Sequence, residues 1–274
     1  PPRSPGVYLE PGLGVAALPD GGAVVTGHCK GQAVFAPGVM LSAAGGTDMF
    51  LARYRADGSL VFAIRGGGQG VDEGASVALI PGDDEILVTG SVDSDFALDF
   101  PGTVGTVNVA ARTRSLDIFV ARYASDGSPI FLLLAGGGGN DRGAGITAAS
   151  DQTLWVTGQI DAASPPVAFD QRFDAPVPLS LSAQGLQGFL AHYSRDGTFL
   201  AARAFGGAGR DLGAGVAATN DGGVLVTGQF TGEAAFGDPP GQDDTLTSAG
   251  GLDVFVARFR SDASLAYAKR AGGV

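Results

Sequence analysis

Val24-Val-Thr-Gly27 is the string that decides the fold, because the chain repeats it as Leu87-Val-Thr-Gly90, Trp155-Val-Thr-Gly158 and Leu225-Val-Thr-Gly228. A second string recurs in the same phase, as Phe50-Leu-Ala-Arg-Tyr54, Phe119-Val-Ala-Arg-Tyr123, Phe189-Leu-Ala-His-Tyr193 and Phe255-Val-Ala-Arg-Phe259. Each copy then reaches a Gly-Gly pair. A period of about 68 residues is typical of repeated supersecondary units that bury their faces against their neighbours.

The fourth copy shows most clearly what one repeat contains. The apolar run 215–219, the turn Asn220-Asp-Gly-Gly223 and the β-rich run 224–228 predict a hairpin, because Asp-Gly supplies the positive φ angles of a tight turn. A second hairpin is predicted from 253–259, a turn around Asp262 and 265–269. Each repeat therefore predicts four antiparallel strands.

Four such repeats, at approximately 1–68, 69–138, 139–208 and 209–274, predict an all-β fold. A β-propeller of four-stranded antiparallel blades accounts for the period, whereas a β-sandwich, the other architecture with many short strands, does not require one. We therefore expect a single propeller domain over 1–274. It is either a closed four-bladed ring or part of a six- to eight-bladed ring.

The repeats resemble the bacterial SBBP β-propeller repeat family and, more distantly, NHL-type blades. Residues 209–273 match that unit best, through Gly209-Arg-Asp211, Phe230-Thr-Gly232, Phe236-Gly237, Leu246-Thr-Ser248 and Gly250-Gly-Leu-Asp253. The third copy departs most, with Gln187 in place of the aspartate and His192 in place of the arginine. The resemblance implies a secreted or envelope-associated propeller with no shared catalytic residues.

Charge and composition narrow the range of partners. The net charge of −11 argues against nucleic acid, which needs clustered positive charge. No apolar run approaches the roughly 18 residues of a membrane span, so membrane insertion is not expected. Cys29 is the single cysteine and excludes an intrachain disulfide.

The links between the second and third strands of each repeat offer the most variable surface. They run at about 28–47, 91–116, 159–186 and 229–252, and loops on a rigid scaffold commonly carry binding. Their acidic residues are the predicted binding residues: Asp93, Asp95, Asp99, Asp170, Asp174, Asp243 and Asp244. Spacing such as Asp93-x-Asp95-x-x-x-Asp99 is compatible with Ca²⁺, but the closing Glu and sixth-position Gly of a calcium loop are missing. Solvated acidic loops without a metal or cofactor are the favoured interpretation.

Each link also contains one phenylalanine, Phe35, Phe100, Phe169 or Phe236, which we expect to pack against its own sheet. A small extra hairpin is expected in each link.

Other carboxylates recur at equivalent positions of several copies, which suggests a structural role. Asp72, Asp141 and Asp211, with Glu10 at the equivalent place, lie in the connectors between repeats, where we expect them to accept backbone N–H bonds. Asp48, Asp117 and Asp253 lie five residues before an arginine, and both partners change together in the third copy. This hints at an interaction within each pair or with one shared neighbour.

Catalytic chemistry finds little support in the sequence. His28 and Cys29 are adjacent, but nothing near them predicts a lowered thiol pKa. The two histidines do not form a metal-binding or Ser/His/Asp pattern. Trp155 takes the place of Val24, Leu87 and Leu225, so we expect it in the core.

Three functions remain open from the sequence. The leading one is a non-enzymatic, secreted or cell-surface binding or scaffolding module whose links engage a protein or glycan. The second is a polysaccharide-directed hydrolase or lyase that uses acidic residues such as Asp170 and Asp174. The third is a purely structural module of a longer surface protein with further repeats.

Overall fold

The computed structural model describes residues 8–93, 115–162, 167–169, 185–237 and 244–273, with the backbone alone for residues 8–11. Within these ranges the regular elements are β-strands, and no α-helix is present. A search of the same residues for a helix able to span a membrane finds none.

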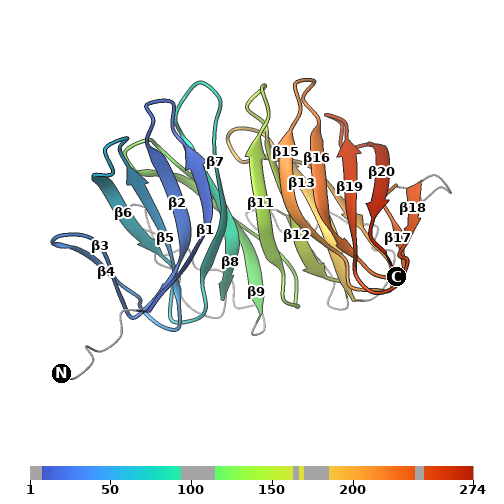
Figure 1. Cartoon of the computed structure of the whole chain (residues 1–274), viewed down its shortest axis with the longest axis horizontal. Helices are drawn as coiled ribbons and strands as arrows, with labels where there is room; N and C mark the ends of the chain where they lie inside the picture. Colours follow the sequence, from blue (N-terminus) through green and yellow to red (C-terminus); the bar gives the residue numbers. More distant parts are fainter. Residues whose placement is uncertain (1–7, 94–114, 163–166, 170–184, 238–243, 274) are drawn as a thin grey trace. The chain divides into compact units, whose positions relative to one another are not determined.

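Within the described residues, sixteen strands form four sheets of four strands each. Figure 1 labels most of these strands. Sheet 1 contains β1 (Tyr8–Ala17), β2 (Ala23–Lys30), β5 (Asp48–Tyr54) and β6 (Leu60–Gly66). Sheet 2 contains β7 (Glu73–Leu79), β8 (Ile86–Asp93), β9 (Leu116–Tyr123) and β10 (Pro129–Ala135). Sheet 3 contains β11 (Arg142–Ala148), β12 (Leu154–Asp161), β13 (Leu186–Tyr193) and β14 (Phe199–Phe205). Sheet 4 contains β15 (Leu212–Ala218), β16 (Val224–Phe230), β19 (Asp253–Phe259) and β20 (Leu265–Ala271).

The predicted all-β fold with four antiparallel strands in each repeat is confirmed. Two links also carry the expected extra hairpin, formed by β3 (Gln32–Ala36) with β4 (Val39–Ser42), and by β17 (Glu233–Ala235) with β18 (Thr245–Thr247). The corresponding part of the second link lies outside the described residues, and in the third link only 167–169 are described, where Ala168 bridges Gly136 as Ala235 bridges Gly206. The chain divides into two compact units, Pro1–Leu132 and Leu133–Val274, and the single domain over 1–274 stays a prediction.

The Val-Thr-Gly string owes its recurrence to a contact between the second and third strands of each sheet. Its threonine hydroxyl donates to the carbonyl of the repeated phenylalanine, at 2.6 to 2.8 Å. Its glycine pairs directly with the same phenylalanine across the strands, as Gly158 does with Phe189. A Cβ at Gly158 would lie 3.0 Å from that ring and would overlap the carbonyl oxygen of Arg142. Only glycine leaves room for both neighbours.

The turn between the third and fourth strands of each sheet also follows from its sequence. The aspartates Asp57, Asp126, Asp196 and Asp262 each accept the N–H of the residue two positions later. The next residue has positive φ, which glycine adopts freely at 58, 127 and 197 and Ala263 adopts at 64°.

Aromatic side chains from the links complete the cores, as predicted. Phe35 lies 5.0 Å from Phe50, and Phe236 lies 4.7 Å from Phe255, measured between ring centroids. Phe169 packs on Phe189 in the same way, at 5.3 Å, while Phe100 lies outside the described residues. In the second unit Phe205 adds a fully buried ring between sheets 3 and 4, 5.4 Å from Phe236.

We expect the substitution Gly158→Ala to lower the free energy of unfolding by about 2 kcal/mol, because the new methyl group has no space beside the Arg142 carbonyl. Chemical denaturation followed by tryptophan fluorescence measures the change. Gly251→Ala is the matched control, since a Cβ there meets no atom within 4 Å. Equal unfolding midpoints for the two variants would contradict the packing explanation.

Candidate binding surface

The connectors between repeats are built around a buried carboxylate, as the sequence predicted. One oxygen of Asp72, Asp141 and Asp211 accepts the N–H of a connector glycine four residues earlier, at 2.6 to 2.7 Å. The other oxygen accepts an N–H at the end of the second strand of the following sheet, donated by Asp93, Asp161 or Thr231. These aspartates therefore tie each connector to the sheet that follows it. Glu10 occupies the equivalent place in β1, but its side chain is not described.

A second set of buried aspartates anchors the links. Asp48 accepts the N–H of Ala44 at 3.1 Å and pairs with Arg65, and Asp253 accepts the N–H of Ala249 at 2.8 Å and pairs with Arg270 at 2.9 Å. In sheet 3 the aspartate is replaced by Gln187 and the arginine position is taken by Ala204.

The predicted pairing of Asp48 with Arg53, and of Asp253 with Arg258, is wrong. Residues five apart in a strand point to opposite faces, so the two side chains of such a pair cannot meet. Arg53 instead reaches the first turn of its sheet and contacts Asp20 at 3.4 Å, as Arg258 contacts Asp221 at 2.5 Å. Among the described residues, Asp48 and Arg53 bond to different partners, and so do Asp253 and Arg258.

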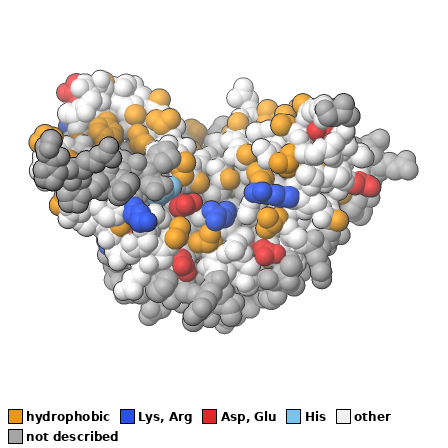
Figure 2. All heavy atoms as spheres, turned by 60° about the horizontal axis from the view of Figure 1, so that its bottom comes forward, with side chains coloured by type: hydrophobic (Ala, Val, Ile, Leu, Met, Phe, Trp, Pro, Cys, Tyr) orange, Lys and Arg blue, Asp and Glu red, His pale blue; other side chains and the backbone are white. Residues whose placement is uncertain are grey.

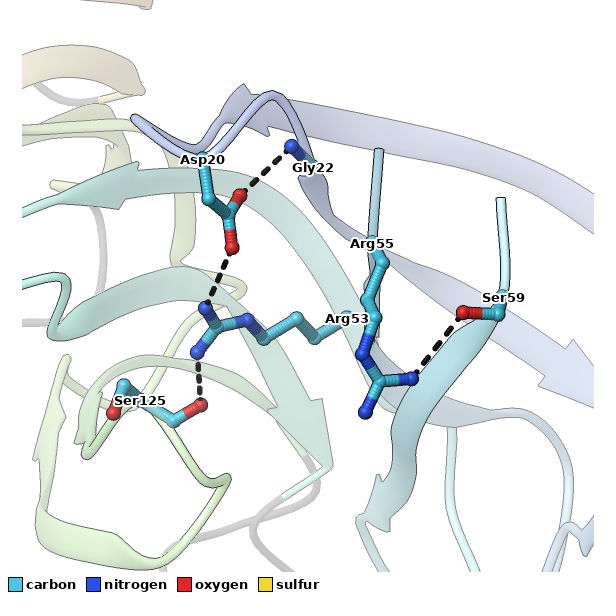
Figure 3. Close-up of polar contacts among 6 residues, drawn as sticks. All are labelled: Asp20, Gly22, Arg53, Arg55, Ser59 and Ser125. Atoms are coloured by element: carbon cyan, nitrogen blue, oxygen red, sulfur yellow. Dashed lines mark hydrogen bonds and ion pairs between the residues drawn. The ribbon is translucent and has the colours of Figure 1, made fainter. Parts of the chain in front are cut away.

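Figure 3 shows how Arg53 also joins the two sheets of the first unit. Its second guanidinium nitrogen donates to the carbonyl of Ser125, in the turn after β9, at 2.5 Å. Arg122 makes the equivalent ion pair within sheet 2, to Glu85 at 2.5 Å. These arginines are structural groups of the turn end, opposite the links.

The third repeat replaces this ion pair with stacked rings. His192 lies flat on Trp155, with centroids 3.7 Å apart and an interplanar angle of 7°, because the two residues pair directly across β12 and β13. Burial lowers the pKa of His192, and nearby Asp151 opposes this only in part. Trp155 is fully buried, which confirms its predicted place in the core.

Two of the seven acidic residues predicted to bind are described, and both are half-buried. The backbone N–H of Asp93 donates to Asp72 at 3.0 Å, and its side chain packs against Gly70. The side chain of Asp244 packs against Gly237. The other five, Asp95, Asp99, Asp170, Asp174 and Asp243, lie outside the described residues. No group of three metal-ligating side chains occurs among the residues that the structure describes.

The adjacent His28 and Cys29 offer no nucleophile. Cys29 is fully buried on β2 beneath the β3–β4 hairpin. Burial, with a smaller contribution from Asp48, raises the pKa of its thiol, so the reactive thiolate is disfavoured. The side chain of His28 lies 4.0 Å from Glu73.

The β3–β4 hairpin presents the most distinctive surface among the described links. Ala33 is fully buried against Cys29 and Phe50, and Phe35 and Leu41 pack on the same cluster. The opposite side of the hairpin carries Val34 and Met40, which pair directly and are 52% and 51% exposed. Apolar side chains on both faces of a hairpin are unusual, because a free face normally carries polar residues.

We define the hairpin patch as Val34, Val39 and Met40, with Lys30 exposed at the end of β2. Sequence analysis recognised Phe35 in this link but missed the patch. The signal that could have found it is the alternation in 32–41, where both alternating sets contain apolar residues. Figure 2 shows the link end of the molecule, where hydrophobic, basic and acidic side chains are interspersed over the described part.

A comparison of the chain with protein-family models found no matching family. A comparison with curated proteins found no similar sequence.

Proposed function

We propose that the protein is a non-enzymatic binding or scaffolding β-propeller, exported to the cell surface or beyond, whose links engage a protein or glycan partner. The four repeated sheets support the propeller, because radially packed four-stranded sheets are the building units of that fold. The ring is either closed by four blades or part of a larger ring of six to eight.

The hairpin patch is the observation that carries the binding proposal. Two paired apolar side chains, each more than half exposed, stand on a hairpin whose other face is fixed by a buried cluster. Rigid presentation lowers the entropy that binding must overcome, and exposed apolar groups gain free energy when a partner covers them. Lys30, which is exposed at the end of β2 just before the hairpin in the chain, favours a partner surface that combines apolar and acidic groups.

We expect the double substitution Val34→Ser/Met40→Ser to abolish binding while leaving the fold unchanged, because both side chains are exposed. The measurement is binding of the immobilised protein to a panel of polysaccharides and purified cell-surface proteins. Val61→Ser/Leu200→Ser is the matched control, since these residues are 39% and 49% exposed but belong to the outer strands β6 and β14.

Binding that survives the double substitution would count against the hairpin patch. The same polysaccharide panel, analysed for released products, separates the binding function from a hydrolase or lyase. Product formation by the intact protein would replace the binding proposal with the enzymatic one.

A further inference from the structure

One face of sheet 4 is open to solvent although it carries apolar side chains. The strand register places on one side of sheet 4 a set of residues that we define as its front face: Leu225, Thr227, Gln229, Val254, Val256, Arg258, Tyr267 and Lys269. Its apolar side chains therefore share the face with two cations, of which Arg258 pairs with Asp221. Val254, Val256 and Tyr267 are 44%, 40% and 41% exposed. Contiguous exposed apolar side chains of this kind mark interaction surfaces.

The same positions are buried where another sheet follows within the same unit. Val256 corresponds to Leu51 in sheet 1 and to Leu190 in sheet 3, both 0% exposed. In the first unit β7 contacts β1, β2 and β5, and in the second unit β15 contacts β11, β12 and β13. The first strand of a following sheet is therefore the element that covers a front face.

The contact between a front face and the strand that covers it is specific, because a glycine of the covering strand packs against the threonine of the covered sheet. A Cβ at Gly74 would overlap the hydroxyl of Thr26, and a Cβ at Gly213 would overlap that of Thr157. The strands approach so closely that a Cβ at Gly145 would lie 3.1 Å from the Cα of Gly215. Thr227 presents the same hydroxyl on the front face of sheet 4, where it is exposed.

Strand β1 also has an exposed surface, which is equivalent to the surface of β7 that covers sheet 1. We define the rear face of β1 as Gly12, Val15 and Ala17, which correspond by register to Gly74, Val77 and Leu79 of β7. Val77 is 7% exposed beneath sheet 1, whereas Val15 is 70% exposed. A Cβ at Gly12 would meet only atoms of the neighbouring strand β2. The rear face of β1 therefore has the glycine and the valine that a front face accepts.

We propose that the front face of sheet 4 binds the rear face of β1 from a second copy of this chain, with Gly12 of one copy against Thr227 of the other. Each face is exposed within its own unit, so a second copy supplies the cover that each lacks. Two copies related by a twofold axis make this contact twice. The product is a dimer.

The test measures the mass of the intact chain by sedimentation velocity and light scattering over micromolar concentrations. We expect twice the chain mass of 27.3 kDa. Val256→Lys and Val15→Lys each place a charge in the contact, and each is expected to weaken association by at least about tenfold. Both residues are exposed in the single chain, so neither substitution disturbs the core. Val61→Lys, an exposed valine outside both faces, is the control and keeps the dimer.

A mixture of the two lysine variants makes the test specific. Val256→Lys copies retain an intact rear face of β1, and Val15→Lys copies retain an intact front face of sheet 4. We therefore expect the mixture to form a heterodimer through one contact at concentrations where each variant alone is largely monomeric. A monomeric wild-type chain at these concentrations, a dimer insensitive to Val256→Lys, or a ladder of ever larger species would each overturn the proposed dimer.

Discussion

Replacing Asp141 with alanine is expected to lower the free energy of unfolding of the second unit by about 4 kcal/mol. Asp141 is fully buried, and its two oxygens accept the N–H groups of Gly137 at 2.6 Å and Asp161 at 2.7 Å. Alanine leaves both amides without an acceptor in a site closed to water, and each unsatisfied buried amide costs about 1 to 3 kcal/mol. Urea denaturation followed by the fluorescence of Trp155 in the same unit measures the loss.

The conservative variant Asp141→Asn distinguishes loss of hydrogen bonds from loss of volume. Asparagine keeps one acceptor oxygen but turns its amide group toward the second donor, so an intermediate destabilisation is expected. Asp196→Ala is the control, because Asp196 accepts an N–H in an exposed turn of the same unit and should therefore change the stability much less. If Asp141→Ala were no more destabilising than Asp196→Ala, the connector carboxylates would not hold the repeats together.

The elements that the sequence predicted well are those encoded within a few residues. The strands follow from Asp-Gly turns and β-rich runs, and the connector aspartates follow from their repetition beside glycine. A group that recurs in every repeat has the same partners each time, so its structural role can be inferred without knowing the register. The same logic placed Trp155 in the core, since its counterparts are Val24, Leu87 and Leu225.

The contacts that the sequence did not reveal depend on strand register and on neighbours. Asp48 meets Arg65 because the paired strands β5 and β6 bring the two residues together, although they are 17 residues apart in the sequence. The repeated spacing of Asp48 and Arg53 suggests an ion pair. Side chains alternate between the two faces of a strand, however, so two residues five positions apart point in opposite directions.

Exposure likewise depends on what lies opposite a strand. Val256 and Leu190 follow the same repeat pattern, yet one is 40% exposed and the other is fully buried. The pattern specifies an apolar face but does not say whether another sheet covers it. The candidate binding surface was missed for the same reason, since the outward face of the β3–β4 hairpin differs from its inward face only in its neighbours.

The stability of the first unit is expected to fall as the pH rises from about 4 to about 7, because of Asp72. Burial, opposed in part by the N–H groups of Gly68 and Asp93, raises the pKa of Asp72 to about 7, and the nearby carboxylates Asp48 and Asp93 add to the rise. An unfolded aspartate has a pKa of about 3.9.

Because the folded pKa exceeds the unfolded one, the stabilising contribution of Asp72 is complete below about pH 4 and is lost as the pH approaches 7. A separation of about three pKa units corresponds to a loss on the order of 4 kcal/mol.

The variant Asp72→Asn isolates this effect, since asparagine does not titrate. At pH 4 the variant is expected to be the less stable protein, because its amide group faces one of the two N–H donors. The difference in stability between the wild type and the variant should shrink steadily toward pH 7, because the wild-type carboxyl then loses its proton in a buried site. Asp57→Asn serves as the control, because Asp57 is exposed and its bonds to Ser59 lower its pKa, so any stabilising contribution from Asp57 is lost as the pH falls, in the opposite direction to that of Asp72. A difference between wild type and Asp72→Asn that stays constant from pH 4 to pH 8 would show that Asp72 is ionised in the folded protein over the whole range, with its hydrogen bonds outweighing the cost of burial.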